Sequence, residues 1–270
     1  MTSPVLVGAV IYDPKVALIW ETISDFFQAE GCPIDCVFYT NYELMVDALL
    51  ADHIHVAWNS PLAWVDAQRR SKDKCRALAM RDTDRDRVSH VIVRTGTGIA
   101  AVGDLRGKTI ATGAKDSPQA TLLPIHLLMK EGLTPKRDFE VRRFDLMVGK
   151  HGDHIGGERE ALRSLEQGES AACAMLDLNW QRWSTDGTID PSRYQILATT
   201  GPFDHCNFTV TERFAPDVEK KWTKVLLSMR YDNPAHREMM DMEGLTAWLP
   251  GRTSGYAALT EAVQQQGYFG

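Results

Sequence analysis

The segment His55-Val56-Ala57-Trp58-Asn59-Ser60-Pro61-Leu62-Ala63-Trp64 contains a junction between a strand and a helix. Its first half is apolar, whereas Ser60 followed by Pro61 is typical of a helix N-cap with proline at the first helical position. We therefore predict a strand over residues 53–58 and a helix over residues 61–70.

The same alternation of strand and helix continues on both sides of this junction. Short apolar runs predict further strands at residues 5–11, 35–39, 108–112, 141–144 and 171–176. Apolar residues at helical spacing predict helices at residues 15–30, 42–50, 117–132 and 157–167. The last third differs, with strands at residues 194–198 and 207–211 followed by helices at 217–230, 234–242 and 254–266. Repeated βαβ units of this kind predict an α/β protein with two lobes.

The composition is that of an ordinary globular protein. Of the 270 residues, 44% are hydrophobic and 24% are charged, and the formal net charge of -6 argues against a general nucleic-acid binder. No apolar stretch approaches the roughly 20 residues of a membrane-spanning helix, so we expect no membrane anchor.

The N-terminal residues and the cysteines both favour the cytoplasm. The first eight residues have neither the basic region nor the apolar stretch of an export signal, so we expect a periplasmic location only if a signal peptide was removed. An odd number of scattered cysteines fits reduced, buried thiols better than a disulfide framework. These residues are Cys32, Cys36, Cys75, Cys173 and Cys206.

Five short motifs occur in the order in which they are found in one family of binding proteins. They are Asn41-Tyr42, the segment 55–64, Asp104-Leu105-Arg106-Gly107-Lys108-Thr109-Ile110-Ala111, Gly168-Glu169-Ser170-Ala171-Ala172 and Met242-Glu243-Gly244-Leu245. The chain thereby resembles the phosphonate/phosphate-type receptor subunits of ABC transporters, a branch of the type II periplasmic-binding-protein fold.

The resemblance implies a ligand cleft between two lobes that close by hinge motion. We expect one lobe from residues 1–92 and 204–270 and the other from residues 93–203, joined by two crossing strands near His90 and Cys206. The expected partner is a small, anionic metabolite, and a permease is a partner only if the chain is exported.

The family's anion-binding loop, rich in serine and threonine, corresponds here to residues 113–121. Only Ser117 is clearly retained, and proline and glutamine replace hydroxyl residues after it. Ser117 reads as an N-cap, so the amides of Gln119 and Ala120 should point out of the positive end of a helix and could hold an anion. The alternative is an ordinary capped helix without a ligand.

Four further candidates follow predicted strands, where open α/β sheets bind ligands: Tyr12, Asn59, Ser60 and Trp64. The indole of Trp64 would either stack on the ligand or belong to the core.

Asp177 and His90 complete the candidate ligand contacts. Asp177 corresponds to an acidic residue that the family presents to amino or hydroxyl groups of the ligand, and the alternative is a helix N-cap. His90 falls at a predicted crossing between the lobes.

The segment His151-Gly152-Asp153-His154-Ile155-Gly156-Gly157-Glu158 concentrates imidazoles and carboxylates between a strand and a helix. His151, His154 and Glu158 are therefore candidates for catalysis, anion contact or metal binding, although their spacing matches no standard zinc pattern. The alternatives are a solvated glycine-rich turn and, for Glu158, an acid that complements the helix dipole.

His205 and Cys206 are a second candidate pair for catalysis, because an imidazole can lower the pKa of a thiol. The alternative is a buried structural thiol. The sequence contains no Walker A loop, no G-x-G-x-x-G, no H-E-x-x-H and no G-x-S-x-G motif. We therefore expect a cytoplasmic solute-binding protein, with an enzyme on the same fold (a lyase, a decarboxylase or a related activity) as the alternative, and we leave its cofactors open.

Overall fold

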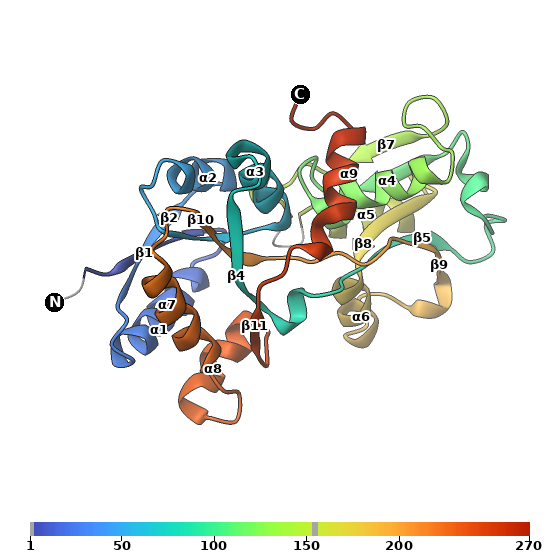
Figure 1. The fold of residues 1–270 in the computed structure, drawn as a ribbon. Coiled ribbons are helices and arrows are strands. Elements are labelled where there is room, and N and C mark those ends of the chain that lie inside the picture. The colour runs from blue at the N-terminus through green and yellow to red at the C-terminus, as the bar shows by residue number, and fades with distance from the viewer. Residues whose placement is uncertain (1–2, 153–155) are drawn as a thin grey trace. The chain divides into compact units, whose positions relative to one another are not determined.

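The computed structural model describes residues 3–152 and 156–270 (Figure 1). The chain divides into two units, the first made of Met1–Arg85 with Asp204–Tyr256 and the second of Asp86–Phe203 with Ala257–Gly270. The expected division assigned residues 204–270 entirely to the first lobe. The structure differs there, because the C-terminal helix packs on the second unit, and the described chain consequently passes between the units at three places instead of two.

The first unit contains eleven named helices and strands within its described residues. In chain order they are β1 (Val5–Val10), α1 (Lys15–Ala29), β2 (Ile34–Tyr39), α2 (Tyr42–Leu50), β3 (Val56–Asn59), α3 (Pro61–Ser71), β4 (Cys75–Arg81), β10 (Asn207–Thr211), α7 (Pro216–Leu227), α8 (Pro234–Glu243) and β11 (Trp248–Pro250).

The sheet of the first unit is covered on both faces. Its strand order is β11-β4-β10-β3-β1-β2, with β1 parallel to β2 and β3, and β10 antiparallel to β3 and β4. Figure 1 shows α2 and α3 on one face and α1 and α7 on the other. The apolar stripe of α1, with Ile19, Ile23 and Phe27, packs against β-strand residues such as Val7 and Phe208. This burial removes a large apolar area from water and fixes the positions of the strand ends.

The second unit contains nine named helices and strands within its described residues. In chain order they are β5 (Ser89–Arg94), β6 (Thr109–Thr112), α4 (Leu123–Lys130), β7 (Glu140–Arg143), α5 (Glu158–Glu166), β8 (Ala172–Leu176), α6 (Asp177–Thr185), β9 (Tyr194–Thr199) and α9 (Ala257–Gln265).

The sheet of the second unit has the strand order β7-β6-β8-β5-β9, in which β6 is parallel to β7 and β8, and β5 is antiparallel to β8 and β9. On one face, α5 and α6 form a core around Trp183 and Met175. On the other face, Leu128 of α4 packs against Val91 and Ile110. Helix α9 lies beside α4 (Figure 1), and the side chain of Gln266 donates to the Leu122 carbonyl oxygen at 2.8 Å.

The helix predicted over residues 117–132 begins with a π-helical turn, Pro118–Leu122, before α4. Pro124 has no amide hydrogen, so it cannot donate to the Ala120 carbonyl four residues earlier. That carbonyl oxygen instead accepts the Gly113 amide at 3.1 Å. The turn is thereby tied to the strand end that precedes it.

The sequence analysis missed three elements. Strand β4 carries arginines among residues that also favour helices, and β11 has only three residues. Helix α6 has no apolar stripe, since only Asp177 and Trp183 of its nine residues are buried.

Candidate functional site

The candidate residues of the second unit gather at one edge of its sheet. Strands β6 and β8 are parallel neighbours, so the loop that follows Thr112 and the residue that follows Leu176 leave the sheet on the same side. Strand β5 runs the other way and starts there, because Ser89 pairs with Leu176. The Ser117 loop, Asp177 and His90 therefore lie at the edge where such sheets bind ligands.

Ser117 is the N-cap that the sequence predicts. Its Oγ accepts the Ala120 amide at 3.1 Å, and Pro118 occupies the first helical position. Ser117, Gln119 and Ala120 are all buried. The Oε1 of Gln119 is a buried acceptor that has no hydrogen-bond partner among the described residues.

The glycine-rich loop that carries His151 lies directly on this turn. The Gln119 side chain donates to the Gly152 carbonyl oxygen at 2.5 Å, and the Ala114 amide donates to the Gly156 carbonyl oxygen at 2.9 Å. Gly152 has a φ of +69°, and a Cβ built there would lie 2.3 Å from Ser117 Oγ. Only glycine allows so close an approach, so two segments that are far apart in the sequence form one buried structure.

His151 is buried in this loop, whereas Asp153 and His154 lie outside the described residues. The metal hypothesis for His151, His154 and Glu158 therefore stays a prediction.

Glu158 connects the start of α5 to the start of α6. Its Oε1 accepts the Leu176 amide at 2.9 Å, and its Oε2 accepts the side-chain amide of Asn179. The carboxylate thus fixes the end of β8, from which Asp177 projects.

Asp177 is 7% exposed and is the first residue of α6 rather than its N-cap, which is Leu176. Its Oδ2 lies 3.6 Å from Arg87 Nη1. Its Oδ1 is a buried acceptor with no hydrogen-bond partner in the described part of the chain. Arg87 lies in a loop without any motif, so the sequence analysis did not identify it as a candidate site residue.

His90 is half-buried close to Asp177, and its Nδ1 lies 3.0 Å from Thr199 Oγ1. Burial lowers the pKa of His90, and the Asp177 carboxylate offsets part of that effect. The imidazole is therefore neutral over a wider pH range than an exposed one.

In the first unit, Asn59 ends β3 and belongs to a buried polar network. Its Nδ2 donates to Thr209 Oγ1 at 2.9 Å, and that hydroxyl donates to Asn207 Oδ1 at 2.7 Å. The Asn207 side chain in turn donates to the Tyr256 hydroxyl at 2.8 Å. The Oδ1 of Asn59 has no hydrogen-bond partner among the residues that the structure describes. Buried polar residues at every second position of β10 are the signal by which the sequence could have indicated this network.

The remaining candidates of the first unit occupy different environments. Ser60 Oγ caps α3 by accepting the Ala63 amide at 3.1 Å. Trp64 is 2% exposed, and its ring lies 5.4 Å from that of Tyr256. Of the two alternatives given for this residue, the structure shows the core position. Tyr12 is partly buried at the end of β1, against the core.

His205 and Cys206 are in contact, and Asp84 joins them. His205 Nδ1 lies 3.1 Å from Cys206 Sγ and 3.5 Å from Asp84 Oδ1. Within the described residues, these three side chains form a cluster whose potential metal-ligand atoms all lie within 4.8 Å of one another.

Arg81 binds both carboxylate oxygens of Asp84, at 2.7 and 2.8 Å. Burial alone would raise the pKa of Asp84, but the Arg81 guanidinium outweighs it and holds that pKa well below its usual range. Cys206 is 1% exposed, which suits the structural role better than attack on a substrate.

Comparison with protein families identifies the chain. Residues 13–256 match the family described as ABC transporter, phosphonate, periplasmic substrate-binding protein. The chain belongs to this family. This match confirms the resemblance predicted from the sequence motifs. Members of this phosphonate-binding family bind small-molecule ligands and work with ABC permeases.

Solved structures share the fold of this family member over nearly its whole length. PhnD1 from Prochlorococcus marinus, in complex with methylphosphonate, is 16% identical, with a TM-score of 0.72 and coverage of 97% of this chain and 98% of that one. A Xanthomonas citri protein bound to ATP is 17% identical, with a TM-score of 0.76 and 98% coverage of both chains. The predicted type II periplasmic-binding-protein fold is thus confirmed.

Sequence similarity to curated proteins is more limited. An uncharacterized protein of Haemophilus influenzae is 52% identical over 33 residues, which are 12% of this chain and 46% of that protein. The family is described as periplasmic, whereas the sequence analysis favoured the cytoplasm. No helix among the described residues is long and apolar enough to cross a membrane.

Proposed function

We propose that this member of the phosphonate-binding family binds a small zwitterionic ligand, with an anionic head group near the Ser117 turn and an amino or hydroxyl group at Asp177. An aminoalkylphosphonate has this chemistry. The solute-binding role itself follows from the family, and the choice of ligand is our proposal.

The observation that carries the proposal is the unpartnered oxygen of Asp177. A buried acceptor without a hydrogen bond costs about 1–3 kcal/mol, and more when it is charged. Arg87 lies 3.6 Å from the other oxygen and compensates only part of the charge. A ligand ammonium or hydroxyl group would satisfy Asp177 Oδ1, whereas a plain anion would be repelled by it.

The Ser117 turn supports an anionic head group at the neighbouring strand end. The helix that starts there presents the positive end of its dipole. Because Ser117 Oγ already accepts the Ala120 amide, the hydroxyl mainly holds the turn in shape. The buried side-chain amide of Gln119 belongs to this turn, and its second N–H can donate to an anion.

The test compares two ligands that differ only in the donor group. Titration calorimetry with 2-aminoethylphosphonate and ethylphosphonate should show tighter binding of the amino ligand by the parent chain. In Asp177→Asn, which keeps the shape of the side chain but removes its charge, the affinity for the amino ligand should fall at least tenfold. The affinity for ethylphosphonate should stay equal or rise, since a repulsive charge has been removed.

Glu169→Gln is a matched control, because it removes a carboxylate from an exposed pair with Arg142 in the same unit. It should bind both phosphonates like the parent. If neither ligand binds, or if Asp177→Asn weakens both ligands equally, the proposed orientation is wrong.

Closure of the two units on the ligand and delivery to an ABC permease are further parts of the proposal. Small-angle scattering with and without 2-aminoethylphosphonate would measure closure, and unchanged scattering at saturation would contradict it. The enzyme alternative finds no support in the comparisons, and the cytoplasmic location stays a prediction that cell fractionation tests.

A further inference from the structure

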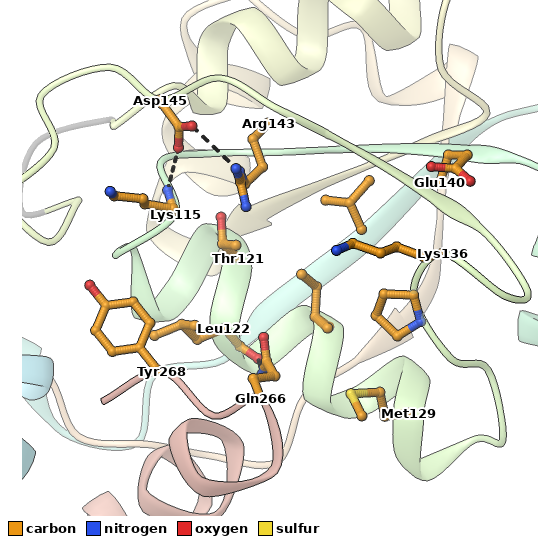
Figure 2. Close-up of a pocket in the computed structure, with 13 residues that line it drawn as sticks. Lys115, Thr121, Leu122, Met129, Lys136, Glu140, Arg143, Asp145, Gln266 and Tyr268 are labelled. Atoms are coloured by element: carbon orange, nitrogen blue, oxygen red, sulfur yellow. Dashed lines mark hydrogen bonds and ion pairs between the residues drawn. The ribbon is translucent and has the colours of Figure 1, made fainter. Parts of the chain in front are cut away.

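The second unit contains a pocket that does not include Ser117 or Asp177. Its volume is about 760 Å³, which lies within the range of small-molecule sites. The π-helical turn and α4, the edge strand β7, and the residues that follow α9 line it (Figure 2). All these segments belong to one unit.

The charged lining of the pocket is mainly cationic, because three basic residues outnumber the carboxylates of Glu140 and Asp145. Lys136 and Arg143 reach toward its middle in Figure 2, and Lys115 also lines it. Arg143 Nε lies 3.4 Å from Asp145 Oδ2, and Asp145 Oδ1 accepts the Lys115 amide at 2.7 Å, so this carboxylate is already engaged. Among the described residues, Lys136 forms no ion pair or hydrogen bond through its ammonium group.

The opposite side of the pocket, formed by the helical turn and α4, is apolar through Leu122, Ile125 and Met129. Pro135, before β7, and Val141, in β7, add apolar surface next to the cationic residues. Thr121 stands between the two sides. It is 2% exposed, and its hydroxyl oxygen has no hydrogen-bond partner within the described residues.

We propose that this pocket is a second ligand site, which binds a small amphipathic anion. The carboxylate or phosphate group of such a ligand would lie against Lys136 and Arg143, near the Thr121 hydroxyl. Its apolar body would lie against Ile125 and Met129. Each half of the pocket favours one half of the ligand, because cations attract the head group and apolar side chains exclude water from the body.

The site is distinct from the proposed phosphonate site but adjoins it along the chain. Both Lys115 and Thr121 line the pocket; Lys115 precedes the turn capped by Ser117, and Thr121 lies within that turn. An occupant would therefore contact the same helix start from another side, without occupying the place of a phosphonate.

The experiment uses octyl phosphate and octanoate as probes in titration calorimetry on the whole chain. Inorganic phosphate carries only the charge and 1-octanol carries only the apolar body. We expect both octyl anions to bind at least tenfold more tightly than either of these half-probes. Saturating ethylphosphonate should leave the octyl phosphate affinity unchanged within a factor of about three, because the two sites do not overlap.

Two variants test the two halves of the pocket. Lys136→Gln/Arg143→Gln should lower the affinity for octyl phosphate at least tenfold. The matched control is Arg142→Gln, on the same strand, whose side chain pairs with Glu169 at 2.9 Å and does not line the pocket. Met129→Trp should fill the apolar side and weaken octyl phosphate and octanoate alike.

Lys136→Gln alone changes one exposed side chain, so it keeps the test valid if the double variant fails to fold. The proposal is overturned if octyl phosphate does not bind, if it binds the charge variants as tightly as the parent, or if 1-octanol binds equally well. Displacement of octyl phosphate by ethylphosphonate would place both ligands in one site and would also contradict it.

Discussion

Gly152→Ala tests whether the His151 loop and the Ser117 turn act as one structure. The substitution has two separable effects. An alanine at a φ of +69° costs roughly 1–2 kcal/mol of backbone strain. The new Cβ would also lie 2.3 Å from Ser117 Oγ and 2.9 Å from Gln119 Nε2, so the loop must move away. That movement breaks the hydrogen bond from Gln119 to the Gly152 carbonyl oxygen, which contributes about 0.5–1.5 kcal/mol.

The matched control is Gly187→Ala. Gly187 has a φ of +81° in the same unit, and a Cβ there would meet no atom within 4 Å. Both substitutions restrict the unfolded chain equally, so that contribution cancels in the comparison. The extra cost at Gly152 is about 1–2 kcal/mol, from the lost hydrogen bond and the contact with Ser117. For a chain of this size that difference lowers the melting temperature by roughly 2–8 °C relative to Gly187→Ala.

Urea denaturation and calorimetry measure this difference, and titration with 2-aminoethylphosphonate measures its effect on binding. We expect about tenfold weaker binding in Gly152→Ala, which corresponds to roughly 1.4 kcal/mol, and parental binding in Gly187→Ala. Equal melting temperatures and equal affinities in the two variants would refute the reasoning, because the close contact would then have no energetic consequence.

Three further predictions concern single side chains. Asp84→Asn should destabilise the first unit by about 1.5–3 kcal/mol in urea denaturation, because it removes the bidentate charged partner of the Arg81 guanidinium and leaves only Glu243 to pair with it; a loss below 1 kcal/mol would contradict this. Ser117→Ala should cost about 1 kcal/mol through the lost cap on the Ala120 amide, and an unchanged urea midpoint would show that the cap is dispensable. His90 has a lowered pKa when folded, so the unfolded chain binds a proton first as the pH falls below about 6.5. Stability should therefore decline between that pH and the lower folded pKa; His90→Gln should reduce this decline, and identical pH profiles would count against it.

The strand and helix pattern was predictable wherever burial imposed a period on the sequence. The junction at Ser60 and Pro61 formed as predicted, because an N-cap and a first-turn proline act locally. Helix α6 was missed, since its position is held by Glu158 from another helix rather than by an apolar stripe of its own. The only indication of this helix in the sequence was Asp177, an acidic residue of the kind that occurs at helix starts.

The candidate site was predictable in its residue types but not in its contacts. The sequence indicated Ser117 and His151 separately, yet the glycine contact that joins them depends on how β6 and β7 lie side by side. The sequence did not indicate Arg87, because its role depends on Asp177, which is distant in the sequence, and the contact of Asp84 with His205 is equally distant. Charge pairs of this kind become visible only once the chain has folded.

The three passages of the chain between the units have a consequence for synthesis on the ribosome. The first unit needs residues up to Tyr256, and the second needs Ala257–Gly270 to complete its covering of α4. Because residues 86–203 of the second unit are translated before the last segment of the first, neither unit can finish folding before most of the other has been made. Strictly sequential folding of one unit after the other, which suits chains with contiguous domains, is therefore not open to this chain.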